Sequence, residues 1–495
     1  MQDAQPAPFS YDILTDRMKD KATRLYEAPP ENLPDYLQNL DYDQYRSIRF
    51  KTDRAKWPDS DLFRIQAFHL GWLSREALIM HEITNGMAKP MQFSAADFSY
   101  PTDELTQQMT DGPWPGIAGF RIHSPINTKT VFDELVAFQG ASYFRALGRG
   151  NNYGLSARGI VIDSWVEGPE EFPRFSEFYM EHPAPGQPLA IYAALEGPSV
   201  TGAYRFIITP ANADVQETVM EVTARLFFRA DVLELGIAPL TSMFLYADNN
   251  RSQFDDYRPQ VHDSNGLIIE KKTGEVIWRA LNNPPSLANS YFGESDLAGF
   301  GLYQRNRSFD DYQDAEAHYE RRPSLRVEPI GDWGQGSVRL IEVPAKLEAD
   351  DNIGAFWVPA EPIKAGDMRE FSYRLRWGDL NPGSASGLAY VADTRGGQGG
   401  VSGVANNATL RKFVIDFKGG PLETLDPATP PDIATTITGG TLKVSTVSKI
   451  ETNGIWRLVL DVEIAGDNPV ELQAFLSDKG RQLTETWLYQ WRAAA

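Results

Sequence analysis

Residues 189–229 read LAIYAALEGPSVTGAYRFIITPANADVQETVMEVTARLFFR, and this stretch carries the pattern that decides the fold. Three runs within it are rich in β-branched, aromatic and other apolar residues, namely Leu189–Ala194, Tyr204–Ile208 and Thr218–Arg229. They are separated by segments containing Gly, Pro, Asn and Asp, the residues that favour turns. Short strands with turn signals at this spacing predict an antiparallel β-sandwich.

The same rhythm continues outside this stretch. Further runs of this kind are Tyr45–Phe50, Phe63–Phe68 and Val338–Val343. Near the start, however, Tyr11–Tyr26 places its apolar residues largely on one stripe, which predicts an amphipathic helix. We therefore expect an all-β chain that begins with one helix.

A segment rich in Gly, Ser and Asn, between Trp377 and Val401, marks the clearest domain boundary. Such a composition is typical of a linker or of an excursion over the surface. The chain beyond it holds several short strand-like runs in about 100 residues, the size and rhythm of an immunoglobulin-like sandwich. These runs are Leu410–Phe417, Thr435–Thr438, Thr441–Val447, Ile455–Ile464 and Val470–Leu476. We expect a large domain over residues 1–380, a linker at about 381–390 and a small domain over 391–495.

Composition excludes several classes of function. The 495 residues include 47 Lys and Arg against 67 Asp and Glu, and the formal charge of −20 would repel phosphate backbones. We therefore expect no nucleic-acid partner. No run approaches the roughly 18 apolar residues of a membrane helix, so we expect no membrane insertion. The chain has no Cys, which excludes disulfides and thiolate metal sites, and neither a metal nor another cofactor is expected.

Two acidic clusters are the candidate sites for chemistry, because the Gly-x-Ser-x-Gly, Walker and His-Glu-x-x-His motifs do not occur. The segment FDDYRPQVHDSNGL, residues 254–267, places three Asp residues, among them Asp263, around Arg258 and His262. From the residues alone a solvated turn, a catalytic carboxylate and a calcium-binding loop all stay open, although the EF-hand pattern is absent.

The second cluster runs from Glu348 to Asn352 and leads directly into the apolar run Ile353–Trp357. Carboxylates at the mouth of a buried strand can be desolvated enough to hold a proton near neutral pH. The alternative is that these polar residues simply cap a strand, and the residues alone leave both interpretations open.

Five segments spread over nearly the whole chain resemble the OpgG/OpgD (MdoG/MdoD) family of periplasmic osmoregulated glucan biosynthesis proteins. One is the FDDYRPQVHDSNGL segment already described. The others are LDYDQYRSIRF at residues 40–50, SYFRALGRGNNYGLSARG at 142–159, APLTSMFLY at 238–246, and GFGLYQRNRSFDDYQDAEAHYERRPSLRVEPIGDWGQGSVRLIEVPAKLEADDNIGAFW at 299–357.

This resemblance implies a galactose-mutarotase-like antiparallel β-sandwich with a long cleft, followed by a small immunoglobulin-like β-sandwich. It also implies a periplasmic location, and export followed by signal cleavage would explain why the opening MQDAQPAPFSYDIL contains no signal peptide. Members of the family act on glucans with a β-1,2-linked glucose backbone, as anomer-inverting glycosidases or as transglycosylases. The alternative is a non-catalytic glucan-binding or scaffolding protein, and a homodimer is expected by resemblance only.

The resemblance also assigns roles to residues. Asp351, in the Asp-Asn-Ile motif, corresponds to the general acid, and Asp263 to the acid on the base side. Glu348 and Asp350 would support Asp351 by raising its pKa through like charge. Inverting enzymes usually hold their two carboxyl groups about 6.5–9.5 Å apart, but in this family a relay of water and a sugar hydroxyl allows a larger separation. The residues expected to bind substrate are Tyr143, Arg145, Tyr153, Tyr257, Arg258, His262, Tyr312, Trp333 and Trp357.

Two positions depart from the family pattern. Arg326 stands where Trp is usual in Ser-Leu-Trp-Val-Glu-Pro, and Gly354 stands where a larger apolar residue is common. We expect these departures to change a sugar subsite. If the water relay is changed as well, a glucan hydroxyl would replace water as the nucleophile, and hydrolysis would become transfer or cyclisation.

Overall fold

The computed structural model describes residues 5–29, 33–383, 386–401, 403, 407, 409–466 and 468–492. Strands contain 47% of the residues and helices 11%, which confirms the all-β class. The chain divides into two compact units. Unit 1 comprises Met1–Pro239, Pro329–Trp333 and Trp357–Gly378, and unit 2 comprises Leu240–Glu328, Gly334–Phe356 and Asp379–Ala495. The domain boundary expected at residues 381–390 stays a prediction.

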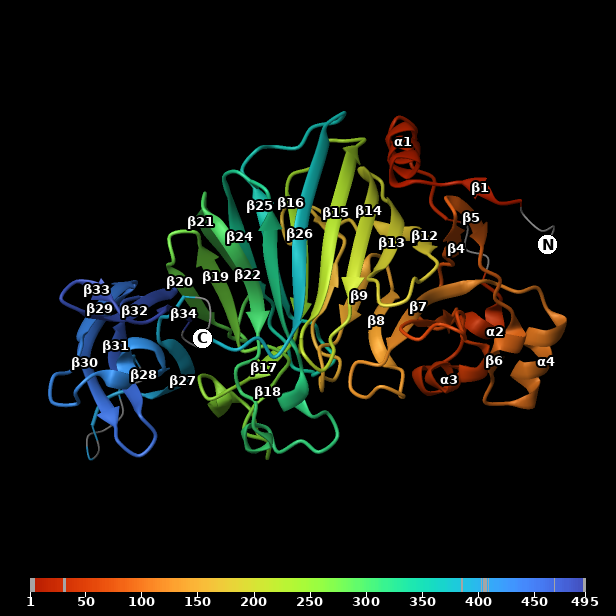
Figure 1. Ribbon diagram of the computed structural model, residues 1–495. Helices are drawn as coiled ribbons and strands as arrows, with labels where there is room; N and C mark the ends of the chain where they lie inside the picture. Colours follow the sequence, from red (N-terminus) through yellow and green to blue (C-terminus); the bar gives the residue numbers. More distant parts are fainter. Residues whose placement is uncertain are drawn as a thin grey trace. The chain divides into compact units, whose positions relative to one another are not determined.

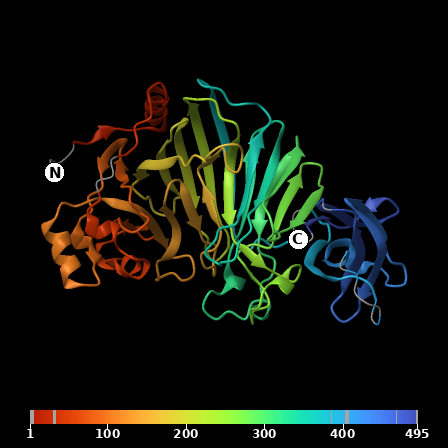
Figure 2. The same cartoon turned by 180° about the vertical axis from the view of Figure 1, so that it is seen from behind.

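Unit 1 contains two facing sheets, which Figures 1 and 2 show from opposite sides. The strands of the first are β1 (Ala7–Pro8), β4 (Ile79–Thr84), β5 (Met87–Pro90), β12 (Arg174–Glu181), β13 (Leu189–Glu196), β14 (Val200–Thr209), β15 (Thr218–Phe228) and β26 (Met368–Gly378). Those of the second are β3 (Arg64–His69), β7 (Ile117–Ser124), β8 (Asp133–Gln139), β9 (Tyr143–Ala146), β10 (Ser156–Arg158), β11 (Ile160–Ile162) and β16 (Leu235–Ser242). The strand orders are β1-β5-β4-β12-β13-β14-β15-β26 and β16-β10-β9-β8-β7-β3, with β11 paired to β16.

Aromatic rings fill the space between these two sheets. The ring centroids of Phe120 on β7 and Phe178 on β12 lie 4.8 Å apart. Those of Phe138 on β8 and Phe206 on β14 lie 5.4 Å apart. Alternate side chains of each strand therefore point into a shared core, as the period of a β-strand requires.

One helix packs where the sequence predicts it. α1 (Tyr11–Ala22) begins after Ser10, whose hydroxyl accepts a hydrogen bond from the backbone N–H of Ile13. Its buried residues Leu14 and Met18 contact the core formed with β14 and β15. No helix in the described parts of the chain is both long and apolar enough to span a membrane.

The strand expected over Tyr45–Phe50 is wrong for most of its length. Residues Tyr42–Ser47 form the helix α3, and only Arg49–Phe50 form a strand, β2, which pairs with β6 (Phe98–Ser99). Asp41 and Gln44 form a capping box, so the local hydrogen bonds of a helix start override the aromatic content. The remaining short helices of unit 1 are α2 (Asp35–Gln38) and α4 (Asp103–Asp111).

Unit 2 contains the remaining strands. One run of paired strands has the order β23-β22-β19-β20-β34-β32-β29, and a separate sheet has the order β27-β28-β31-β30. Two smaller arrays are β21-β24-β25 and β17-β18. Their bounds are β17 (Phe244–Tyr246), β18 (Val261–His262), β19 (Gly266–Lys271), β20 (Val276–Ala280), β21 (Ala288–Glu294), β22 (Leu297–Tyr303), β23 (Ser324–Ile330), β24 (Gly336–Glu342), β25 (Ile353–Pro359), β27 (Tyr390–Gln398), β28 (Leu410–Lys418), β29 (Asp432–Thr438), β30 (Gly440–Ile450), β31 (Ile455–Ile464), β32 (Val470–Asp478), β33 (Arg481–Gln482, paired to β32) and β34 (Thr486–Trp491).

The last strand of the chain joins two distant parts of the sequence. β34 runs parallel to β20, with Trp487 opposite Trp278, so residues near the C-terminus extend a sheet that begins at residue 266 (Figure 1). Trp456, Trp487 and Phe413 are fully buried in the core that results. The expected C-terminal strands are all present. The Gly-rich stretch, however, is not a loop throughout, because β27 occupies Tyr390–Gln398; residues 384 and 385 of that stretch lie outside the described residues.

Candidate carboxylate site

Asp263 is held by a two-stranded ribbon in unit 2. Within that ribbon, Phe244 on β17 pairs with His262 on β18. Asp263 directly follows β18, and its backbone N–H donates to the carbonyl of Met243 at 2.9 Å. A second bond, from the Gln304 side-chain amide to the His262 carbonyl at 2.8 Å, fixes the same segment. Asp263 is 9% exposed, so its carboxylate has a defined position with limited access to water.

Asp351 is attached to the other side of the same ribbon. The next residue, Asn352, is buried, and its side chain brackets the backbone of Phe244. The Phe244 N–H donates to Asn352 Oδ1 at 2.8 Å, and Asn352 Nδ2 donates to the Phe244 carbonyl at 3.0 Å. The amide thus bonds β17 on the side opposite to β18, so Asp263 and Asp351 are attached to either side of the same strand. Asp351 itself is exposed, as is Asp350.

Arg258 is the centre of a cluster of carboxylates beside this ribbon. Its guanidinium contacts Asp256 at 2.7 Å, Asp314 at 2.9 Å, and Glu348. Hydrogen bonds from Arg258 lower the pKa of Asp256 to about 2, and they lower the pKa of Glu348 as well. Glu348 is therefore in direct contact with a cation, and its expected effect on Asp351 stays a prediction.

Tyr319 and Arg322 connect this cluster to Asp263. The Tyr319 hydroxyl donates to Glu348 Oε2 at 2.7 Å, and Arg322 Cζ lies 5.2 Å from the centre of the Tyr319 ring. Arg322 Nε lies 3.5 Å from Asp263 Oδ1. Burial and the bond to Glu348 raise the pKa of Tyr319, so the phenol stays a donor. A continuous chain of contacts therefore runs from the loop before Asp351 to Asp263.

His262 and Tyr312, two of the expected substrate-binding residues, are fully buried beneath Asp263. The His262 ring stacks on Phe244 at 5.4 Å and meets Tyr312 at 5.2 Å. Its Nε2 lies 2.7 Å from the side-chain oxygen of Gln260. Burial lowers the pKa of His262 to about 3, which keeps the imidazole neutral. In the structure both rings support the ribbon, and their contact with substrate stays a prediction.

The other expected substrate-binding residues have varied surroundings. Tyr257, in unit 2, is 76% exposed beside Arg258. In unit 1, Arg145 donates to Ser156 at 2.6 Å, and burial raises the pKa of Tyr153. Tyr143 is half-buried under the guanidinium of Arg158, at 4.9 Å from ring centre to Cζ.

Trp333 and Trp357 lie together in unit 1. Their ring centroids are 6.1 Å apart, and the Trp333 indole N–H donates to the Ser372 carbonyl at 3.1 Å. Trp357 is fully buried and Trp333 is half-buried, so the Trp333 ring is the more accessible of the two.

The two departures from the family pattern have clear structural settings in unit 2. Arg326 binds two carboxylates, Glu270 at 2.6 Å and Glu328 at 2.9 Å. A Cβ added at Gly354 would meet Ile341 at an ordinary 3.8 Å, so packing does not require glycine there. Arg326 is therefore part of an ion-pair network, which the usual Trp could not form.

Sequence reasoning missed Tyr319, Arg322 and Asp314 as parts of the site. Tyr319 and Arg322 are present in the quoted 299–357 segment, but nothing in their spacing marks them. Arg322 lies 59 positions from Asp263 in the sequence, and only the folded backbone brings the two together.

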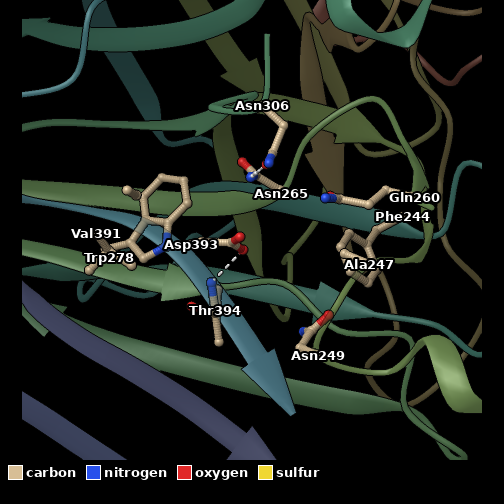
Figure 3. Close-up of a pocket in the computed structure, with 12 residues that line it drawn as sticks. Phe244, Ala247, Asn249, Gln260, Asn265, Trp278, Asn306, Val391, Asp393 and Thr394 are labelled. Carbon is tan, nitrogen blue, oxygen red and sulfur yellow. Dashed lines mark hydrogen bonds between the residues drawn. The ribbon is translucent and has the colours of Figure 1, made fainter. Parts of the chain in front are cut away.

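A small cavity lies beside the ribbon, where Phe244 and Gln260 form part of the wall (Figure 3). Its polar lining is Asn249, Asn265, Asn306, Asp393 and Thr394, and apolar residues that include Trp278 and Val391 complete it. Burial raises the pKa of Asp393 to about 6, although Arg395 opposes this. At about 20 Å³ the cavity has room for roughly one water. In the described part of the chain, no group of three or more His, Cys, Asp or Glu is arranged to hold a metal.

These features define a class: an all-β protein that presents two aspartates on anchored loops, one backed by arginine and one exposed to solvent. Comparison with known proteins is consistent with this class. Residues 9–491 match the family described as "Periplasmic glucan biosynthesis protein, MdoG". The chain belongs to this family, which confirms the resemblance to OpgG/OpgD proteins.

Similar proteins carry both family names. The chain is 55% identical to glucans biosynthesis protein G of Cereibacter sphaeroides, over 99% of this chain and 90% of that protein. It is 41% identical to the protein of the same name from Rhodopseudomonas palustris, over 98% and 94% of the two chains. It is 40% identical to the probable glucans biosynthesis protein D of Shewanella oneidensis, over 98% and 89%.

Proposed function

We propose that this protein acts in the periplasm on the β-1,2-glucan backbone of osmoregulated glucans, as an anomer-inverting glycosidase or transglycosylase. Asp351 is the general acid and Asp263 is the residue on the base side. The observation that carries the proposal is the attachment of both residues to one ribbon, Asp263 directly after β18 and Asp351 through the Asn352 amide. Family membership and the printed names of the relatives support glucan as the substrate.

The surroundings of the two aspartates differ in the way that inverting chemistry needs. Asp263 lies within 3.5 Å of the Arg322 guanidinium, and a nearby cation favours a charged carboxylate that can accept a proton. Asp351 is exposed in a stretch with Glu348 and Asp350, and a sugar chain lying over it would exclude water from its carboxyl group. One protonated carboxyl and one ionised carboxylate form the pair that inversion requires.

The reaction then follows from these protonation states. Asp351 donates its proton to the departing glycosidic oxygen of the glucan. Asp263 receives a proton from the nucleophile, through a water or sugar hydroxyl that bridges the space between the two aspartates. If the nucleophile is water the result is hydrolysis, and if it is a glucan hydroxyl the result is transfer or ring closure.

Substitution of the acid tests this proposal. Asp351→Asn is nearly isosteric and leaves Asn352 in place, so the fold and glucan binding should persist. Turnover of linear β-1,2-glucan should fall by about 10²- to 10⁴-fold, the usual contribution of a general acid. The control is Asp296→Asn, which removes one charge from an exposed position of unit 2 outside the site and should retain most of the activity.

Products should be followed by chain length, ring closure and the anomeric form of each new end or bond. The expected outcome is inversion at the reacting carbon, with turnover lost in Asp351→Asn and retained in Asp296→Asn. Near-normal activity of Asp351→Asn would refute the role of Asp351. If the wild-type protein binds the glucan but leaves it unchanged, the protein is a glucan-binding or scaffolding protein, and the carboxylates are acceptors for sugar hydroxyls.

A further inference from the structure

Unit 2 contains a groove that is separate from the carboxylate site. It is formed where four neighbouring strands present side chains to one face of their sheet. Strand pairing aligns Thr436 on β29 with Gln473 on β32, Gln473 with Leu488 on β34, and Leu488 with Arg279 on β20. A parallel row aligns Thr438, Glu471 and Gln490. Directly paired residues point to the same face of a sheet, so these two rows form one continuous floor that is polar except at Leu488.

The opposite wall of the groove comes from β21, the edge strand of another sheet in the same unit. Asn289, Ser290 and Tyr291 line this wall, and Tyr291 is 50% exposed. The guanidinium of Arg339 lies 5.1 Å from the centre of the Tyr291 ring and supports it from the paired strand β24. The groove has a volume of about 390 Å³, within the usual range of roughly 300–1,000 Å³ for small-ligand sites.

The positive charge beside this groove is compensated within the protein. Arg279 forms an ion pair with Glu342 at 2.8 Å, and both side chains are at least 98% buried. Glu471 is an exposed carboxylate that accepts a hydrogen bond from Gln490 at 2.6 Å. The groups left to meet a ligand are therefore hydroxyls, amides, this carboxylate and apolar side chains that include the Tyr291 ring. This combination favours a neutral ligand with many hydroxyl groups, whose apolar ring face lies on Tyr291 while its hydroxyls bond Thr436 and Gln473.

We infer that this groove is a second carbohydrate-binding site, which holds a segment of a neutral glucan away from the two aspartates. The inference rests on the proposed function for the identity of the sugar, but it shares no residue with the carboxylate site. A polymer held at two places dissociates only when both contacts are lost, so the groove would favour long glucans over short ones through effective concentration.

Binding stoichiometry tests the inference. The parent is Asp351→Asn, in which turnover should be strongly reduced, and the probe is a short linear β-1,2-linked gluco-oligosaccharide whose binding is measured by calorimetry. We expect two sites in this parent. Adding Tyr291→Ala should abolish one site or weaken it at least tenfold. Adding Tyr42→Ala, a control at a tyrosine in unit 1 that is 54% exposed, should leave both sites.

A second variant tests whether the effect of Tyr291→Ala comes only from a local folding defect in the edge strand β21. Thr436→Val with Gln473→Leu keeps side-chain size but removes the hydrogen-bonding groups, and it should weaken the same site. Hydrogen exchange locates that site independently: the oligosaccharide should protect backbone amides of β21, β29 and β32.

The alternatives give different results. Unchanged stoichiometry in both groove variants, or no protection of β21, β29 and β32, overturns the inference even if the protein turns over glucan. Protection of the groove by spermidine or by an extended peptide, but not by the oligosaccharide, also overturns it. If the groove strands are protected while wild-type protein leaves the glucan intact, the inference stands and the proposed catalytic function fails.

Discussion

Replacing Arg258 with Met should reveal how much the carboxylate cluster contributes to stability. The substitution keeps an apolar stem of similar length but removes the cation that contacts Asp256, Asp314 and Glu348. Three carboxylates would then face one another across an uncharged side chain. The direct consequences are repulsion among them and loss of hydrogen bonds that the solvent can only partly replace.

Burial sets the expected size of this effect. The Arg258 side chain is 12% exposed, and its partners are 10% exposed at Asp314, 23% at Asp256 and 39% at Glu348. Removing one partner of a buried ion pair costs about 3–5 kcal/mol, whereas an exposed pair contributes about 0–1 kcal/mol. With two largely buried partners and one more exposed, we expect Arg258→Met to lower the free energy of unfolding by about 3 kcal/mol at pH 7.

Acidification should reduce the difference in the free energy of unfolding between the wild type and Arg258→Met. In the wild type, Arg258 lowers the pKa of Asp256 to about 2 and also lowers that of Glu348. The stability that comes from these depressed pKa values is present above about pH 4 and is lost as the pH falls towards 2. The variant has no such stability to lose, and protonation relieves its repulsion. The two proteins should therefore become more alike at pH 3–4 than at pH 7.

Urea unfolding followed by tryptophan fluorescence at both pH values measures the effect. The control is Arg374→Met, which breaks an ion pair with Glu221 whose side chains are 33% and 47% exposed, and which should cost less than about 1 kcal/mol. A loss for Arg258→Met no larger than that of the control, or a difference that grows on acidification, would refute the reasoning.

Three further outcomes follow from the same contacts. Asn352→Asp should lower the free energy of unfolding by about 1–3 kcal/mol, because two backbone carbonyls lose their donor, and it should reduce glucan turnover; unchanged urea midpoints would contradict this. The pKa of about 3 at His262 lies below its ordinary value of 6.5, so stability should fall as the pH drops from about 6.5, and His262→Phe should flatten that fall in urea midpoints recorded against pH. Arg326→Trp should cost about 1–3 kcal/mol at pH 7, because Glu270 loses its cation, and a variant as stable as wild type in thermal melts would exclude a structural role for this ion pair.

Much of the sandwich could be predicted because burial imposes a simple pattern. In Thr218–Phe228 the residues Met220, Val222, Ala224 and Leu226 alternate with polar ones, and all four are buried in the strand β15. Such a period of two depends only on neighbours in sequence. The wrong prediction around residues 42–47 has a different cause. There a capping box of four residues decides the structure, and aromatic content is a poor guide to it.

The functional site was predictable only in part, and for a physical reason. The segments with Asp263 and Asp351 stand out as acidic clusters, and the family resemblance assigns their roles. The contacts of Arg258 with Glu348 and of Arg322 with Asp263 depend on pairing between distant strands, which no local pattern encodes. The groove at β21 and β29 is even harder to predict from the sequence. Thr436 and Gln473 resemble ordinary strand residues, and only the pairing of β29 with β32 places them side by side.

The anchoring of Asp351 bears on the different tasks that we propose for the two aspartates of one ribbon. In the proposed mechanism a charged anchor would compete with substrate and shift the electrostatics of both carboxyl groups. Asn352 instead uses a neutral amide, which satisfies the N–H and C=O of Phe244 and the carbonyl of Val343 without adding charge. The cations are placed elsewhere: Arg258 on Glu348, and Arg322 near Asp263. Position is thus set by neutral hydrogen bonds and charge by separate arginines, so a sugar chain that covers Asp351 can change its protonation without loosening its attachment.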